Sequence, residues 1–168
     1  MYHDTMAMFA AYNRWCNERL YAAAGLLSED EFRADRGVFF RSMLGTLNHI
    51  LAADRIWMRR FTGSGDAPTR LDAILHDDRA ALGAARVAED ARIAGWIAGL
   101  GEADLAATFT YETITGPETV TQRLAPALLH LFNHQTHHRG QAHAILTGLG
   151  HDTPSLDLIR FQRETGSG

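Results

Sequence analysis

The sequence predicts an all-α protein, a four-helix bundle with a short β-hairpin-like insert between the third and fourth helices. Apolar residues recur at steps of three and four over four long segments, which is the period of the buried face of an amphipathic helix. Before the last segment, residues 108–121 are rich in β-branched and aromatic residues around Gly116-Pro117, a composition typical of extended strands. Periodic helices without a large sheet are typical of a helical bundle.

The length and composition of the chain indicate one domain. With 168 residues, 46% of them hydrophobic, the chain can bury a core of its own but is too short for two. We predict a single domain over residues 1–164 and a flexible tail over residues 165–168.

The first two helices are predicted from their periodicity and from the signals at their ends. The first covers residues 4–26. The segment Ser28–Glu31 has the form of a capping box and opens a short helical turn, after which residues 32–41 form an irregular connection. Ser42 has the side chain of an N-cap residue, and the second helix follows it as far as Phe61.

The second half of the chain continues this pattern. The predicted elements are a turn-rich linker at 62–68, a third helix at about 70–100, the insert at 108–121, a fourth helix from 123–125 to about 148, and a short closing helix at 155–164. Either Thr69 or Asp66 is expected to cap the third helix. Pro126 is compatible only with the first turn of the fourth helix, which places the start of that helix.

Charge and cysteine usage exclude several classes of protein. The 16 Lys and Arg residues are scattered and the net charge is -4, so no nucleic-acid surface is predicted. Cys16 is the single cysteine; it cannot form an internal disulfide, it fits a reducing cytosol, and we expect a buried structural thiol. No stretch approaches the ~18 consecutive apolar residues of a membrane span, and no signal pattern opens the chain. The expected location is cytoplasmic, with no membrane partner.

Five of the nine histidines fall within residues 130–143. On a helix, His134 and His138 lie one turn apart and about 40° from each other, the minimal geometry for two imidazoles to reach one metal ion. Such a pair can also make ordinary hydrogen bonds. His130 and His137 lie within about 100° of His134, so spacing leaves the pairs 130/134, 134/137 and 134/138 open.

A short sequence pattern that occurs twice suggests where a third ligand lies. The second and fourth predicted helices each contain an apolar residue followed by Asn-His, in Leu47–His49 and in Phe132–His134. If the two halves of the chain are similarly built, His49 and His134 are presented from comparable depths, and His138 completes a set of three nitrogen ligands.

Several motifs resemble those of the DinB family, which is part of the wider DinB/YfiT-like group of metalloenzymes. The resemblance runs over roughly residues 5–162 and is most specific in the His-x-x-x-His-Arg-Gly-Gln block. Its motifs are Tyr12–Trp15 with Asn17, Thr46–Leu51 with Asp54 and Trp57, Asn133-His134 with His137–Gln141, and Leu156–Leu158. The resemblance implies a four-helix bundle, often a homodimer, with one divalent metal ion held by three histidines that map onto His49, His134 and His138.

Three neutral imidazoles leave a divalent ion with its charge uncompensated and at least one coordination position open, as in a catalytic site. That position can hold a water activated for hydrolysis, or the thiolate of a low-molecular-weight thiol cosubstrate. The resemblance implies a thiol-dependent S-transferase, since some members of the wider group are enzymes of this kind. We therefore expect a metal-dependent enzyme acting on a small molecule, either such a transferase or a hydrolase. The alternative is a non-catalytic, stress-related dimer that binds metal. The ligand set suits Zn, Ni, Cu or Co, and zinc and nickel are the ions we expect.

Other polar residues near the histidines have expected roles. Four of them are candidates for accepting the free N–H group of a ligand histidine and fixing its tautomer: Asn48, Asp54, Asn133 and Gln141. Asp54 is about 140° around the helix from His49, so we expect it to pair with Arg139 or with another helix. His137 or His130 can act as a general base at neutral pH.

Overall fold

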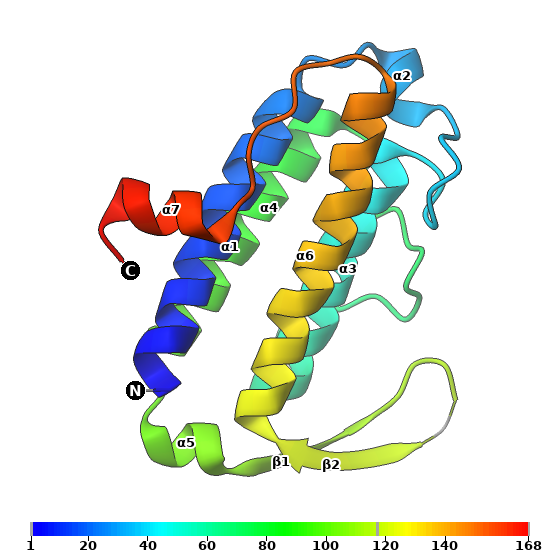
Figure 1. Ribbon diagram of the computed structural model, residues 1–168. Coiled ribbons are helices and arrows are strands. Elements are labelled where there is room, and N and C mark those ends of the chain that lie inside the picture. The colour runs from blue at the N-terminus through cyan, green and yellow to red at the C-terminus, as the bar shows by residue number, and fades with distance from the viewer. Residues whose placement is uncertain (1, 117, 168) are drawn as a thin grey trace.

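The computed structural model describes residues 2–116 and 118–167. Its elements are α1 (Tyr2–Ala24), α2 (Glu29–Arg33), α3 (Met43–Thr62), α4 (Arg79–Ala98), α5 (Glu102–Ala106), β1 (Thr108–Glu112), β2 (Thr119–Arg123), α6 (Leu124–Gly148) and α7 (Leu158–Thr165) (Figure 1). The protein is mostly helical with one small antiparallel sheet in the described ranges, which confirms the coarse prediction of a helical fold with a hairpin insert.

The four long helices α1, α3, α4 and α6 lie side by side (Figure 1). Helices α1 and α3 each pack against both α4 and α6. Buried apolar residues fill the space between them in two large clusters, one containing Leu20, Leu47 and Leu146 and the other Met58 and Leu128. Burial of each such side chain stabilises the fold by about 1.5–3 kcal/mol. None of the helices in the described ranges combines the length and the apolar character that a membrane crossing needs.

Most helix ends match the signals in the sequence. Ser28 and Glu31 form the predicted capping box, with the backbone N–H of Ser28 donating to Glu31 Oε2 at 2.8 Å. Ser42 caps α3 and accepts a hydrogen bond from the backbone N–H of Gly45 at 3.0 Å. Helix α6 begins at Leu124 and carries Pro126 in its first turn, as predicted. These caps fix the point at which the chain enters each helix.

The predicted start of the third helix was wrong. Helix α4 begins at Arg79, and its N-cap is Asp78, whose side chain accepts a hydrogen bond from the backbone N–H of Ala81 at 2.7 Å. Neither Thr69 nor Asp66 caps it.

Residues 70–78 form an irregular segment of turns and bends against α3 instead of the first helical turns. Its apolar residues fit the helical period, yet Leu71 and Ile74 are 37% and 50% exposed. The backbone N–H groups of Leu75 and His76 donate to the side chain of Asn48, at 2.8 and 3.0 Å. A tertiary contact has replaced the hydrogen bonds that a helix would have made.

The insert is a two-stranded hairpin, as predicted. Strand β1 pairs antiparallel with β2, with Tyr111 opposite Val120; Pro117, part of the predicted turn, lies outside the described residues. The inward-facing ring of Tyr111 lies 5.3 Å from that of Trp57 on α3, and the ring of Phe109 lies 5.2 Å from that of Phe61. The hairpin is thereby held against the C-terminal half of α3.

The predicted tail, residues 165–168, begins at the last residue of α7. Thr165 is the last residue of this helix, and Gly166 caps it with a φ of 67°. Gly168 lies outside the described residues. Cys16 is completely buried on α1, with its Sγ atom 3.8 Å from the carbonyl oxygen of Leu156, in keeping with a structural thiol.

The first turn of α3 requires a glycine. A β-carbon at Gly45 would overlap the backbone carbonyl oxygen of Phe40, whereas one at Gly95 of α4 would meet no neighbouring atom. We expect Gly45→Ala to destabilise the protein by about 2 kcal/mol through overpacking. The control Gly95→Ala should stabilise it by about 0.5–1 kcal/mol because alanine is the better helix former. Urea unfolding of both variants measures the difference, and equal stabilities would contradict the close approach of Phe40.

Candidate metal centre

Three histidines from two helices meet in the structure. The Nε2 atom of His49 on α3 lies 3.2 Å from the Nε2 atoms of both His134 and His138 on α6. One ligand atom from each histidine lies within 4.8 Å of the others. Three nitrogens bound to one zinc ion in tetrahedral geometry would be roughly 3.3 Å apart, given Zn–N bonds of about 2.0–2.1 Å. The two observed spacings match those of ligands that share an ion.

The outer ring nitrogens show where the imidazole protons lie. Nδ1 of His49 lies 2.7 Å from the backbone carbonyl oxygen of Leu71, and Nδ1 of His138 lies 2.8 Å from Oε1 of Gln141. Both partners are acceptors, so both Nδ1 atoms carry the proton and both Nε2 atoms present lone pairs. The two lone pairs face each other across 3.2 Å with no proton between them. A cation at this point would remove their repulsion, so the residues present fit a metal ion.

The segment that the sequence assigned to a helix contributes one of these contacts. Asn48 is completely buried, and three of its four hydrogen bonds hold residues 70–78. Its amide donates to the carbonyl oxygens of Leu44 and His76, both at 3.0 Å, while its oxygen accepts from the backbone of Leu75 and His76. This arrangement places the carbonyl group of Leu71 against His49. Asn48 was expected to contact a ligand histidine and instead positions the segment that does so.

Phe40 forms a wall of the site that was not found from the sequence. Its ring stacks on that of His49 with centroids 3.6 Å apart and an interplanar angle of 15°, and it meets the ring of His138 edge-on at 5.4 Å. The chain then enters α3 through Arg41, whose φ of 69° is left-handed and costs roughly 1–2 kcal/mol for a residue other than glycine. The aromatic pair Phe39-Phe40 in an otherwise polar connection was the available signal.

Burial keeps the clustered imidazoles neutral. Desolvation lowers the pKa of His49 to about 4 and, with the neighbouring histidines, lowers the pKa of His134 to about 3. It also lowers the pKa of His138, although the hydrogen bond to Gln141 opposes the shift. At pH 7 all three rings are therefore in the neutral form that binds metal.

The other two candidate histidines of α6 lie outside the cluster. His130 is exposed, with its ring centroid 5.0 Å from that of Trp57 and 5.9 Å from that of His134. His137 is also exposed, and its Nε2 atom lies 3.3 Å from the amide of Gln141. Among the pairs that spacing left open, the structure brings 134/138 into the group with His49.

Asp54 faces away from the histidines. Its carboxylate accepts a hydrogen bond from Arg86 of α4 at 2.6 Å, and a second from Gln135 of α6. The expected pairing with another helix is therefore present, whereas the alternative partner Arg139 donates to Asn13 of α1. Asn133, a further candidate contact of the ligands, is exposed.

Comparison with known proteins gives two findings. The family model described as the DinB family matches residues 1–167. The fold is similar to the crystal structure of a DinB-like protein from Bacillus cereus ATCC 10987, with a TM-score of 0.62 and 17% sequence identity, over 84% of this chain and 90% of that one. At this identity the likeness concerns the fold alone. No curated protein sequence matches the chain.

The role assigned to Asn48 can be tested by truncation. We expect Asn48→Ala to destabilise the protein by about 2–4 kcal/mol, because it leaves partly buried backbone groups of Leu75 and His76 without partners and opens a cavity at the buried Asn48. Hydrogen exchange should become faster at these two amides. The exposed residue of the second Asn-His pair provides the control, and Asn133→Ala should change stability by less than about 0.5 kcal/mol. Unchanged exchange at residues 75 and 76 in Asn48→Ala would contradict the assignment.

Proposed function

The chain belongs to the DinB family, and on this basis we propose that it is a four-helix-bundle metalloenzyme in which His49, His134 and His138 hold one divalent ion. The proposal depends on one observation: the lone pairs on Nε2 of His49 and Nε2 of His138 face each other across 3.2 Å. Two protonated Nδ1 atoms, each held by an acceptor, leave no other favourable arrangement of protons between the rings. Zinc and nickel are the ions that we expect, since both favour imidazole ligands.

The surroundings of the cluster favour an open coordination position. Within the described residues, the group of possible ligands contains no carboxylate and no thiol. Cys16 cannot complete it, because its thiol is buried on α1 against Leu156. A structural zinc site usually has four protein ligands, and a site with three keeps a position for water or substrate.

The proposed reaction is a thiol-dependent S-transfer or a hydrolysis. The bound ion would supply Lewis acidity, which lowers the pKa of a thiol or of a water molecule placed at the open position. The protein's own residues orient the site, since Leu71 and Gln141 hold two rings and the Phe40 ring covers one face of His49. His130 and His137 are exposed beside the cluster and are the candidate proton-transfer groups of the proposed reaction. A homodimer and a cytoplasmic location belong to the same proposal.

Removal of single histidines tests the ligand set. We expect about one zinc ion per chain in the wild-type protein and almost none in His49→Ala, His134→Ala or His138→Ala, because two imidazoles bind zinc far more weakly than three. The neighbouring variants His130→Ala and His137→Ala should keep their metal. Elemental analysis of the dialysed proteins gives the stoichiometry. Metal retained in His49→Ala would mean that α6 binds it without α3.

The Co²⁺-loaded protein separates the possible functions. Appearance of a thiolate-to-cobalt charge-transfer band on addition of cysteine would place a thiol at the open position and favour S-transfer. Metal-dependent ester or amide cleavage without such a band would favour hydrolysis. If neither occurs and metal removal only lowers the melting temperature, the protein is a non-catalytic metal binder and the enzyme proposal is wrong.

The pH dependence of metal binding follows from the lowered pKa values. A proton competes for a ligand nitrogen only below the pKa of that nitrogen, which is about 4 for His49 and about 3 for His134. Bound zinc should therefore persist as the pH is lowered from about 7 to about 5 and be lost near pH 4, whereas exposed histidines would release it from about pH 6.5. Zinc per chain, followed together with circular dichroism, measures this. Loss that begins near pH 6.5 in the folded protein would contradict the buried site.

A further inference from the structure

A second feature, on the same side of α3 as the histidine cluster, is a pocket of about 590 Å³. It lies between the C-terminal half of α3, the segment 67–69, and strand β1 with the turn that follows it. We call it the arginine pocket and define it by Ile56, Arg59, Arg60, Thr69, Tyr111 and Ile114. These residues combine an apolar and aromatic surface with two positive charges.

The positive charges of the arginine pocket are not compensated by ion pairs. In the part of the chain that the structure describes, neither Arg59 nor Arg60 lies within ion-pair distance of a carboxylate. Arg60 lies over the rings of Trp57 and Tyr111, at 4.6 and 4.4 Å, and donates to the backbone carbonyl oxygen of Glu112 at 3.2 Å. Burial lowers the pKa of Arg60. The exposed carboxylate of Glu112 also lines the pocket, so the pocket has a net formal charge of +1.

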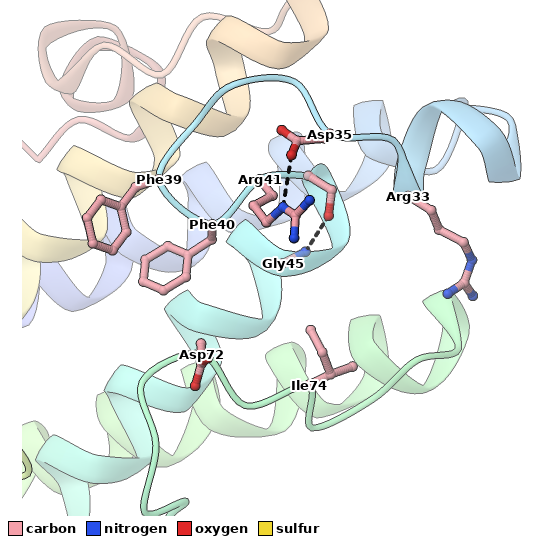
Figure 2. Close-up of a pocket in the computed structure, with 9 residues that line it drawn as sticks. Arg33, Asp35, Phe39, Phe40, Arg41, Gly45, Asp72 and Ile74 are labelled. Atoms are coloured by element: carbon pink, nitrogen blue, oxygen red, sulfur yellow. Dashed lines mark hydrogen bonds and ion pairs between the residues drawn. The ribbon is translucent and has the colours of Figure 1, made fainter.

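A neighbouring pocket of similar size shows the contrast. It has a volume of about 560 Å³ and lies beside Phe39 and Phe40 (Figure 2). Its two arginines are neutralised, because Arg41 pairs with Asp35 at 2.8 Å and Arg33 pairs with Asp77 at 2.6 Å. Uncompensated positive charge therefore distinguishes the arginine pocket from this one.

A continuous series of side chains connects the arginine pocket with the histidine cluster. Ring centroids lie 5.9 Å apart between His134 and His130, 5.0 Å between His130 and Trp57, and 5.3 Å between Trp57 and Tyr111. Along α3, Ile56 follows His49 by seven residues, which is two helical turns on one face and about 10 Å. The pocket and the cluster thus border one surface of the protein.

We propose that the arginine pocket binds the negative group, a carboxylate or a phosphate, of an elongated organic molecule whose other end reaches the histidine cluster, two turns along α3 from Ile56. The guanidinium of Arg59 supplies the charge-assisted hydrogen bonds, and Ile56, Tyr111 and Ile114 cover the apolar body of the molecule. Arg60 is held by the rings of Trp57 and Tyr111 and by the backbone of Glu112. It therefore fixes the hairpin against α3 and adds positive charge to the pocket. As a statement about the substrate, this inference rests on the function proposed above.

Calorimetric titration of the metal-free protein tests the pocket by itself. The probes are 4-phenylbutyrate, phenyl phosphate and the neutral 4-phenylbutanamide. Both anions should bind, the amide should bind at least about tenfold more weakly, and Arg59→Gln should weaken anion binding by a similar factor, since a hydrogen bond to a charged group is lost. The stronger of the two anions identifies the negative group.

The matched control is Arg41→Gln, which alters the neighbouring pocket and should leave binding unchanged. Equal affinity for the amide, or equal loss in both variants, would overturn the proposal.

The Co²⁺-loaded protein tests the link between the pocket and the cluster. The ring protons of bound 4-phenylbutyrate should relax faster than in the Zn²⁺-loaded protein, because the paramagnetic ion would lie beside His49, which is about 10 Å along α3 from Ile56 of the pocket. If cobalt binds and relaxation is unchanged, the link is wrong. If cobalt does not bind while the anions still do, the pocket stands and the proposed metal site fails. The two proposals can therefore fail separately.

Discussion

A buried network of charged and amide side chains ties the four long helices together. Its members are each at least nine-tenths buried: Asn13, Asn17, Asp54, Arg86, Asp90, Gln135 and Arg139. Arg86 of α4 lies at its centre and contacts Asp54 of α3 at 2.6 Å and Asp90 at 2.9 Å. Two carboxylates and two guanidiniums balance in charge. Loss of one partner from such a buried pair costs about 3–5 kcal/mol, because it leaves the other charge unpaired and desolvated. The four helices must therefore pack so that every member of this network keeps its partners.

The network also determines which way the histidines face. Gln135 and Arg139 each follow a histidine of the cluster by one residue, and adjacent residues on a helix point about 100° apart. With these two side chains anchored inward, the rotation of α6 about its axis is fixed, and His134 and His138 face His49 of α3. On α3 the relation is similar, because Asp54 and His49 are five residues and about 140° apart. One face of each helix is fixed by the ion network, and the adjacent face is thereby free to form the candidate site.

Local signals in the sequence were sufficient for the features that depend on near neighbours. The caps at Ser28 and Ser42 and the spacing of His134 and His138 depend on residues within one turn of each other. The segment 70–78 could not be predicted, because its apolar residues fit a helix while its backbone is held by Asn48, more than 25 residues earlier. The partner of Asp54 was open for the same reason: Arg86 lies 32 residues away in sequence, in another helix.

The distribution of charge sets the candidate site apart from the rest of the molecule. The chain has a net charge of -4, and its buried network is neutral. A divalent ion held by three neutral imidazoles would keep its full charge of about +2, and the arginine pocket adds uncompensated charge on the same side of α3. A local field of this kind concentrates anions at the site even though the protein as a whole repels them. The three buried histidines are neutral and leave the charge of a bound ion uncompensated, and Arg59 and Arg60 have no carboxylate within ion-pair distance in the described residues. Both features favour a negatively charged ligand.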